Sequence, residues 1–392
     1  MTSPILPGPP PLRVLHLYAG NLYGGIERVL GVLASQRHLC PEMEPHFALC
    51  FDGRLAEELR AANVPPHMLG NVRLSRPWTV WRARRRLKEL LKATPGFDVV
   101  ITQSCWVHAA FAPTVRQAGL PLWFWAHDAY LHLNRVERAA ARTKPDYVIA
   151  NSKFTLGTIS RLFGDVPGEV LYCPLPSPPP MDRDAVRLAI RTKLGCSLES
   201  KVILMGSRLE PYKGHTLLLE GLALLKPGDW QAWIAGGPQR PHEQDYYTQL
   251  QAMAQRLGIG ERVRWLGQRT DIPQLLRAAD IYCQPNIGPE PFGIVFIEAM
   301  QAGVPVVTTK LGAAPEIVDH TCGMLTEPGM PQSLANELNR LSLGSSRSAL
   351  TGGPARAAAL CDPQQQLELL SAAIKRHARP AGNPDGPRCG AR

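Results

Sequence analysis

The stretch "DIYCQPNIGPEPFGIVFIEAMQAGVPVVTT", residues 280–309, contains a strand, a loop, a helix and a second strand in succession. The apolar runs at 280–285 and 304–309 are typical of buried strands. Between them, Phe292–Ala302 has the composition of a buried helix, and Gly303 is well placed to end it. Two strands joined by a helix run parallel in one sheet, so this stretch predicts a βαβ unit.

The same alternation of short apolar runs and longer helical patterns, such as 26–36 and 77–92, continues along the chain. We expect strands in the first half at 13–18, 46–51, 98–103, 121–127 and 146–151, and in the second half at 201–208, 230–237, 262–267, 280–285 and 304–309. The fold class is therefore α/β, with a parallel sheet in each half. Because ligands of such sheets bind beyond the carboxyl ends of the strands, the loops after the strands are the places to look for a site.

The length of 392 residues predicts two domains, because a single core stops growing at roughly 250–300 residues. The proline-dense segment "CPLPSPPPMDRD" (173–184) suits a stiff connection between them. The segment 379–392 is rich in Pro, Gly and Arg, which predicts disorder. We expect a flexible N-terminus (1–12), an N-terminal domain (13–173), a linker (174–184), a C-terminal domain (185–362), a helix that crosses back to the N-terminal domain (363–378) and a disordered tail (379–392).

The composition limits the class of partner. A formal charge of +10 and a pI near 9.3 favour anionic partners such as nucleotides or phospholipid headgroups. The nine cysteines are scattered without a C-x-x-C or a zinc-ligand spacing, so we interpret them as reduced thiols of a cytoplasmic protein. We see no signal peptide and no apolar run of about 18 residues, so we expect any membrane contact to be peripheral, on the inner face.

Two glutamates lie in the opening stretch. Glu290 lies on the loop before the helix, and Glu298 lies more than one turn inside it among apolar residues. A carboxylate accepts hydrogen bonds from two hydroxyls at once, so the pair suits a polyol such as a ribose or a hexose. The alternative for Glu298 is a salt bridge to an arginine within the domain. The companion residues Gly293 and Ile294 favour the ligand, because backbone N–H groups at a helix start attract anions.

Two further loops carry candidate residues. "GSRLEPYKGH" (206–215) follows the first strand of the second half, and its Arg208 and Lys213 would neutralise a diphosphate if they converge. The alternative is two solvated surface charges. In the first half, Gly24 and Gly25 precede a helix, where they permit close approach of a ligand; a tight turn that binds nothing is equally compatible with this pair.

The first half offers two more features. His127 ends an apolar strand, where a histidine bonds either a sugar hydroxyl or the local backbone. The segment 77–95 predicts a basic helix with Trp78 and Trp81. A sheet-covering helix with a solvated basic face is the plainer interpretation of this segment, and docking to anionic lipid headgroups is the alternative. The aromatic residues do not alternate with basic ones as in nucleic-acid stacking platforms, so we expect no nucleic-acid partner.

Taken in order, five motifs resemble those of the family 4 retaining glycosyltransferases (GT4, "glycosyl transferases group 1"). They are "GGIERV" (24–29), "HD" (127–128), "GSRLEPYKGH" (206–215), "GPEPFGIVFIEAMQAGVPVVTT" (288–309) and "GAAPEIVDHTCGMLTEPG" (312–329). The resemblance spans residues 13–340 and is more specific in the second half. It implies a GT-B fold, in which two Rossmann-like doubly wound domains face across a cleft, and no required metal or other cofactor.

The resemblance also implies a role for each matching residue. Glu298 would bind the ribose of a sugar nucleotide and Glu290 the hydroxyls of the transferred sugar. Arg208 and Lys213 would steady the leaving diphosphate, and His127 would lie near the donor sugar. The remaining donor contacts would come from Phe292, Gly293, Ile294, Gly24 and Gly25. Two departures from the family pattern are the linker "YCPLPSPPP" (172–180), where relatives have an Asn-Gly turn, and Ser207, which interrupts the commoner Gly-Arg step.

The function implied is retaining transfer of a hexosyl group from a nucleoside-diphosphate sugar to a saccharide or lipid-linked acceptor, in the synthesis of cell-envelope polysaccharide or glycolipid. The N-terminal domain would face the acceptor and the C-terminal domain would bind the nucleotide sugar. Two alternatives stay open: a nucleotide-sugar epimerase or hydrolase, and a non-catalytic scaffold that binds a nucleotide sugar.

Overall fold

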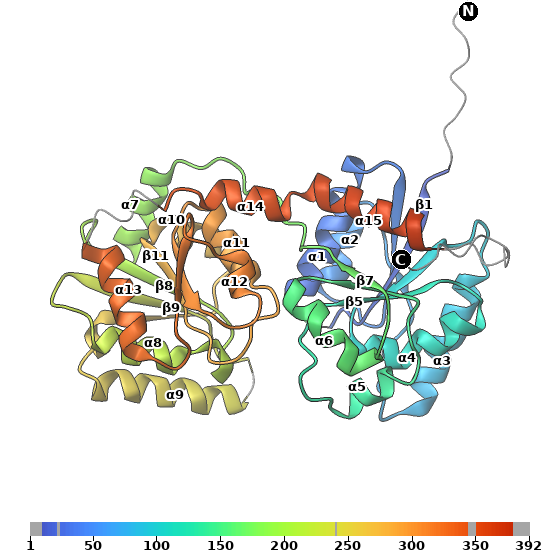
Figure 1. Ribbon diagram of the computed structural model, residues 1–392, viewed down its shortest axis with the longest axis horizontal. Coiled ribbons are helices and arrows are strands. Elements are labelled where there is room, and N and C mark those ends of the chain that lie inside the picture. Colours follow the sequence, from blue (N-terminus) through green and yellow to red (C-terminus); the bar gives the residue numbers. More distant parts are fainter. Residues whose placement is uncertain (1–9, 22–23, 240, 344–349, 379–392) are drawn as a thin grey trace, which may run out of the picture. The chain divides into compact units, whose positions relative to one another are not determined.

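The computed structural model describes residues 10–21, 24–239, 241–343 and 350–378, and the chain divides into two compact units (Figure 1). Unit 1 contains the chain up to Pro176 and from Pro363 onward, and unit 2 is Ser177–Asp362. The change of unit at 176/177 falls within the proline-dense segment. The segments expected to be flexible at 1–12 and disordered at 379–392 lie, apart from residues 10–12, outside the described residues.

Unit 1 contains a seven-stranded sheet in the order β3-β2-β1-β4-β5-β6-β7, and all of its paired strands are parallel. Its strands are β1 (Leu12–Tyr18), β2 (Met43–Leu49), β3 (His67–Met68), β4 (Val99–Thr102), β5 (Leu122–Ala126), β6 (Tyr147–Ala150) and β7 (Gly168–Val170). Its helices are α1 (Gly25–Ser35), α2 (Arg54–Ala61), α3 (Pro77–Leu91), α4 (Cys105–Gln117), α5 (Arg135–Ala140), α6 (Lys153–Phe163), α15 (Pro363–His377) and the 3₁₀ turn η1 (Arg37–Leu39).

The last helix, α15, belongs to unit 1 although it follows unit 2 in the sequence. Ser371 Oγ and Lys375 Nζ donate to the Glu42 carboxylate at 2.8 and 2.5 Å, and the His377 ring stacks on Tyr147 with 4.4 Å between the ring centroids. Arg376 Nη2 donates to the carboxylate of Glu169 at 3.0 Å. These contacts join the end of the described chain to β6, β7 and the segment before β2.

Unit 2 contains a six-stranded parallel sheet in the order β10-β9-β8-β11-β12-β13. Its strands are β8 (Lys201–Gly206), β9 (Trp230–Ala235), β10 (Val263–Gly267), β11 (Ile281–Gln284), β12 (Val306–Thr309) and β13 (Gly323–Thr326). Its helices are α7 (Arg183–Lys193), α8 (His215–Ala223), α9 (Pro241–Arg256), α10 (Ile272–Ala278), α11 (Ile294–Gln301), α12 (Ala314–Ile317), α13 (Pro331–Leu343) and α14 (Gly353–Cys361), with 3₁₀ turns η2 (Pro211–Lys213) and η3 (Gly260–Arg262).

Both faces of the unit 2 sheet are covered by helices. Leucines of α8 and α13, with Leu250 and Ala254 of α9, pack on one face in a single apolar core. On the other face α10 packs against α7 and α11 against α14 (Figure 1). In each sheet the chain first builds strands to one side of the first strand and then returns on its other side, so the strand order reverses between β1 and β4 and between β8 and β11. Such reversal points are where doubly wound sheets bind ligands.

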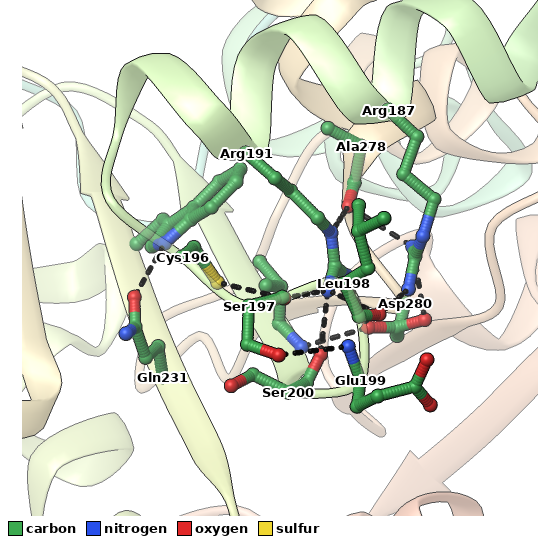
Figure 2. Close-up of polar contacts among 12 residues, drawn as sticks. Arg187, Arg191, Cys196, Ser197, Leu198, Glu199, Ser200, Gln231, Ala278 and Asp280 are labelled. Carbon is green, nitrogen blue, oxygen red and sulfur yellow. Dashed lines mark hydrogen bonds and ion pairs between the residues drawn. The ribbon is translucent and has the colours of Figure 1, made fainter.

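A fully buried arginine, Arg191, joins α7 to the segments just before β8 and β11, at the amino ends of these strands (Figure 2). Arg191 Nη2 donates to Asp280 Oδ2 at 2.7 Å, and its other nitrogens donate to backbone carbonyls, including those of Ser200 (2.7 Å) and Ala278 (3.0 Å). Arg187 also pairs with Asp280, at 3.2 Å. Burial lowers the Arg191 pKa, and the Asp280 carboxylate offsets part of that effect. This buried ion pair holds the strand starts and leaves the carboxyl ends free for a site.

The expected parallel sheets and all ten expected strands are confirmed to within a few residues. The expected start of the helix at Phe292 is wrong. The helix begins at Ile294, because Gly293 adopts a left-handed conformation (φ 88°) that a right-handed helix excludes. The eight cysteines within the described residues are buried and form no disulfide. Among those same residues, no helix combines the length and the apolar character needed to cross a bilayer.

Candidate functional site

The loops after β8 and β11 meet at the reversal point of the unit 2 sheet. Gly214, at the end of the β8 loop, has φ 83°, and a Cβ added to it would lie 1.8 Å from the carbonyl oxygen of Pro285. The backbone N–H groups of Ile287 and Gly288 donate to the carbonyl of Tyr212 at 2.9 and 3.2 Å. Only a glycine permits this approach. The contact brings residues separated by more than 70 positions in the sequence side by side.

The centre of the site is an ion pair between Lys213 and Glu290. Lys213 Nζ donates to Glu290 Oε2 at 2.6 Å, and the two side chains are 12% and 9% exposed. Gln284 and Asn286 donate to the same oxygen at 3.2 and 3.4 Å. No described residue bonds the other carboxylate oxygen, Oε1. Three donors therefore hold Glu290 by one oxygen, and its second oxygen is left with the capacity to accept a hydrogen bond.

The loop after a third strand, β12, fixes the backbone of Glu290. Ala313, in the loop after β12, donates its N–H to the Glu290 carbonyl at 2.8 Å, and Gly312 forms a parallel bridge with Glu290. A Cβ at Gly312 would lie 2.2 Å from the Glu290 carbonyl oxygen. Thr309 Oγ1 also donates to the carbonyl of Asn286 at 2.6 Å. Three strand ends thus determine the position of one carboxylate.

Two helices begin at this edge without a side-chain cap. The residue before α8 is Gly214 and the residue before α11 is Gly293, and both glycines are left-handed. Neither has a side chain that could accept the first N–H groups of its helix. Such N–H groups and the positive end of the helix dipole favour an anion. Phe292 is buried before α11 and Ile294 is half-buried at its start. The backbone at 292–294 is thus suited to contact a phosphate.

Arg208 does not join Lys213. Its guanidinium is 61% exposed and pairs with Glu210 at 2.8 Å, within the same loop. The expected convergence of two cations is therefore not seen in the contacts of the structure. Lys213 instead neutralises Glu290 and lies over the Tyr212 ring, 4.9 Å from its centroid. Burial and the nearby Glu290 charge raise the pKa of the Tyr212 phenol, which keeps it protonated at neutral pH.

Glu298 lies in the second turn of α11 and is partly exposed, whereas Ile297 and Ala299 on either side are fully buried. Glu298 therefore keeps some contact with solvent despite the apolar sequence around it. This exposure lowers the desolvation cost that a fully buried glutamate would incur.

His215 is a site residue that the sequence reasoning missed. It is the first residue of α8, fully buried, with Nε2 3.3 Å from Ser207 Oγ. Burial, with a smaller contribution from Lys213, lowers its pKa to about 4, so it is neutral at pH 7. A histidine that directly follows a Lys-Gly step after a strand was the available signal.

In unit 1, a row of three polar side chains crosses the reversal point between β1 and β4. His127, just after β5, donates from Nε2 to Gln103 Oε1 at 2.8 Å, and Gln103 donates from Nε2 to His16 Nδ1 at 3.0 Å. Burial lowers the pKa of both histidines to about 3, so both are neutral. His127 therefore carries its proton on Nε2 and presents Nδ1 as an acceptor. Gln103 and His16 were not predicted.

The glycine pair of unit 1 lies at the start of α1, with Gly24 before the helix and Gly25 as its first residue. The N–H of Gly24 donates to Glu27 Oε2 at 2.8 Å, and Tyr18 OH donates to Glu27 Oε1 at 2.8 Å. Burial and Glu27 raise the Tyr18 pKa. A buried carboxylate thus already occupies part of this helix start, which weakens it as an anion site.

The described residues contain no group of three His, Cys, Asp or Glu side chains arranged to hold a metal ion. The polar side chains described above at the two reversal points are carboxylates, one lysine, amides and neutral histidines. This set suits hydroxyl and phosphate recognition.

Comparison with known families agrees with this chemistry. The sequence model described as "Glycosyl transferases group 1" matches residues 186–351, and that described as "Glycosyltransferase Family 4" matches residues 23–176. The first match lies in unit 2 and the second in unit 1. Together they confirm the family predicted from the motifs.

Curated relatives are similar over parts of the chain. A D-inositol 3-phosphate glycosyltransferase of Corynebacterium glutamicum is 33% identical over 159 residues, which are 38% of this chain and 37% of that protein. The lipopolysaccharide core biosynthesis mannosyltransferase LpsB of Rhizobium meliloti is 28% identical over 245 residues, which are 62% of each chain. The chain thus matches less than two thirds of the length of these relatives.

A solved structure is similar over nearly the whole chain. The Anabaena protein HepE, solved in complex with UDP and glucose, is 27% identical, with a TM-score of 0.78 over 93% of this chain and all of HepE. This similarity confirms the expected fold class. With both family models matched and the fold shared along the length of HepE, this chain belongs to the family 4 (group 1) glycosyltransferases and has the GT-B fold.

Proposed function

We propose that this protein is a retaining glycosyltransferase that moves a hexosyl group from a nucleoside-diphosphate sugar to an acceptor hydroxyl. The observation that supports it most is the Glu290 carboxylate, held on Oε2 by Lys213, Gln284 and Asn286, while no residue in the described part of the chain bonds Oε1. A buried, immobile acceptor of this kind suits the hydroxyls of a bound sugar. Its direct neighbour is a cation, which suits the phosphate attached to that sugar.

The leaving diphosphate would be stabilised by three groups of this chain. Lys213 Nζ carries hydrogens beyond the one given to Glu290, and the N-termini of α8 and α11 supply backbone N–H groups. Arg208 would turn from Glu210 toward the diphosphate, a movement favoured by its exposure. As the glycosidic bond stretches, these donors stabilise the negative charge that develops on the phosphate oxygen. The acceptor would attack from the same face and transfer its proton to that oxygen, which retains the anomeric configuration.

The other residues of the proposed site would bind the rest of the donor. Glu298, partly exposed on α11, would accept the ribose hydroxyls, and the backbone at Phe292, Gly293 and Ile294 would contact sugar and phosphate. From unit 1, His127 would accept a sugar hydroxyl at Nδ1, and Gly24 and Gly25 would lie on the phosphate side. That proposed role of His127 depends on the Gln103 hydrogen bond, which sets its tautomer.

Donor and acceptor follow from the relatives as proposals. HepE binds UDP and glucose, so UDP-sugars are the first donors to test. The name of LpsB, a lipopolysaccharide core biosynthesis mannosyltransferase, supports a cell-envelope polysaccharide or glycolipid as the product. We also propose that the transfer needs no metal ion, so that a chelator leaves the rate unchanged, and that the protein acts in the cytoplasm.

The test combines a thermal-shift screen of UDP-, GDP-, ADP- and TDP-sugars with kinetics of three variants. We expect Lys213→Ala and Arg208→Ala to lower kcat by about 10²–10³-fold while nucleotide affinity changes by less than about tenfold, because both groups act mainly on developing charge. Lys226→Ala, at an exposed lysine of unit 2, is the matched control and should retain full activity. Unchanged turnover in both site variants would refute the assignment.

Product analysis separates the alternatives. With donor alone, a transferase releases sugar slowly, an epimerase interconverts the donor and a hydrolase consumes it rapidly. Nucleotide-sugar binding without turnover on any acceptor would identify a scaffold. The anomeric configuration of the product, read by NMR, tests retention.

A further inference from the structure

The outer face of α3 exposes two large aromatic side chains that the fold does not use. Trp78 and Trp81 are 58% and 62% exposed, the highest values among the large apolar side chains of the described residues. They lie three positions apart and therefore on the same face of the helix. Leu74, just before the helix, is also exposed. Exposed apolar clusters of this kind mark interaction surfaces.

The inner face of α3 explains how the helix is held. Ala83, Leu87 and Leu91 are buried in a core shared with β1 and α4. Arg84 Nε donates to the carbonyl of Ala110 at 2.6 Å, and Arg86 Nη1 donates to that of Leu69 at 3.2 Å. These contacts secure the helix without either tryptophan. The outer face is therefore open to substitution without loss of the core.

The same outer face is strongly basic. Residues 73–92 contain eight Arg and Lys and a single acidic residue, Glu89. Glu89 pairs with Arg85 at 3.1 Å, and the Arg84 and Arg86 side chains bond backbone carbonyls of their own unit. The basic side chains left exposed without such a contact among the described residues are Arg73, Arg76, Arg82, Lys88 and Lys92. At 100° per residue, Arg82, Lys88 and Lys92 lie with the two tryptophans within an arc of about 120°, opposite buried Leu87.

We propose that the surface formed by Trp78, Trp81, Arg82, Lys88 and Lys92 docks on an anionic phospholipid bilayer. The helix would lie flat, with the two indoles at the level of the headgroups and the lysine and arginine heads on lipid phosphates. A helix of 15 residues presents this surface over about 22 Å. The two indoles and the three cations lie on the same face of α3. Both groups can therefore contact a bilayer at once, because its charged phosphates lie outside its apolar interior.

This proposal stands apart from the proposed transfer reaction, because it rests on α3 alone. If the acceptor is lipid-linked, the surface would place unit 1 where that acceptor is found. The two proposals fail separately: vesicle binding is measured without any sugar, and transfer can be measured on a soluble acceptor without any vesicle.

The test is sedimentation of the full chain with vesicles of phosphatidylcholine alone or of phosphatidylcholine and phosphatidylglycerol in equal parts. We expect the protein to partition at least about tenfold more strongly onto the anionic vesicles, with a blue shift of tryptophan emission and loss of binding in high salt. Trp78→Ser with Trp81→Ser should weaken binding on the order of tenfold for each residue and abolish the blue shift. Arg82→Gln with Lys88→Gln should weaken binding to anionic vesicles by about fivefold for each charge.

The matched controls lie on unit 2. Leu188→Ser with Met330→Ser removes two apolar side chains that are each 53% exposed, and Lys193→Gln with Lys226→Gln removes two exposed charges. Both control proteins should bind vesicles as the unmodified chain does, and circular dichroism should show all variants folded. Absence of binding to anionic vesicles, or equal binding by the tryptophan variant and the unmodified protein, would overturn the proposal. The latter result would indicate a surface that recognises charge alone, as for a nucleic acid.

Discussion

Replacing Gly214 with alanine would test whether the contact between the β8 and β11 loops determines the site. The new Cβ would lie 1.8 Å from the Pro285 carbonyl oxygen, so that loop must move by about 1.6 Å to reach the 3.4 Å of an ordinary contact. The movement would break the bonds that Ile287 and Gly288 make to Tyr212 and the bond from Thr309 to Asn286. Three bonds at about 1 kcal/mol each, with about 1 kcal/mol for a left-handed alanine, give a loss of about 4 kcal/mol.

Gly258→Ala is the matched control. Gly258 is also left-handed (φ 71°), but a Cβ there would meet no atom of the described residues within 4 Å. We expect it to lose only about 1 kcal/mol, because it carries the backbone strain alone. Urea unfolding gives both free energies. Because Asn286 follows Pro285 directly and Glu290 lies on the same loop, Gly214→Ala should also lower sugar transfer by about 10²-fold, as expected for a displacement of about 1 Å at a reacting group. Equal stability losses in the two variants, with transfer intact, would refute the reasoning.

Two further predictions concern buried polar groups. Arg191→Met should lower the free energy of unfolding by about 3–5 kcal/mol, because it removes a buried charged donor from Asp280 and from several backbone carbonyls of Figure 2. Arg187→Met, at a partly exposed partner of the same carboxylate, should cost clearly less. Chemical denaturation compares the two variants, and equal losses would contradict the assignment. Burial lowers the pKa of four histidines to about 3 or 4 in the folded protein. The stability that these neutral side chains contribute is therefore complete above about pH 6.5, the pKa of an unfolded histidine, and is lost as the pH falls toward the folded pKa values. These four should take up about four protons on unfolding at pH 5, to which His46 and His67 add because burial also lowers their pKa values. Calorimetry in buffers of different ionisation enthalpy measures the uptake, and a value near zero would contradict the pKa shifts. The four are His16, His108, His127 and His215.

Nine of the ten expected strands were predictable because they are short apolar runs in the interior of a parallel sheet, whereas β10 lies at an edge. The strands absent from the ten expected are the short β3, β7 and β13, each at an edge of its sheet. His67–Met68 is too brief to show a pattern, and Gly323–Thr326 contains a glycine that suits a turn as well as a strand. Edge strands receive less burial than central ones, so their sequences carry a weaker signal.

At the site, the sequence indicated which loops matter but not which side chains meet. Lys213 and Glu290 were both predicted as site residues. Lys213 was expected to converge with Arg208 on a diphosphate, but in the structure it bonds Glu290. The partner of a charged side chain depends on rotamers and on close loop contacts, which spacing along the chain does not specify. Gln284 and Asn286 were missed because an amide at a strand end looks like an ordinary turn residue. Polar residues at the carboxyl ends of adjacent strands were the available signal for them.

The place of α15 in unit 1 has a consequence for biosynthesis. The helix supplies the partners of Glu42, Tyr147 and Glu169, yet the ribosome makes it only after the whole of Ser177–Asp362. At about 5–20 residues per second, unit 1 waits roughly 10–40 s for its last helix. During that interval the nascent chain exposes the apolar surface that Leu367, Leu370 and Ile374 later cover. A cell that makes this protein must shield that surface, or translate the intervening unit quickly enough to limit its exposure.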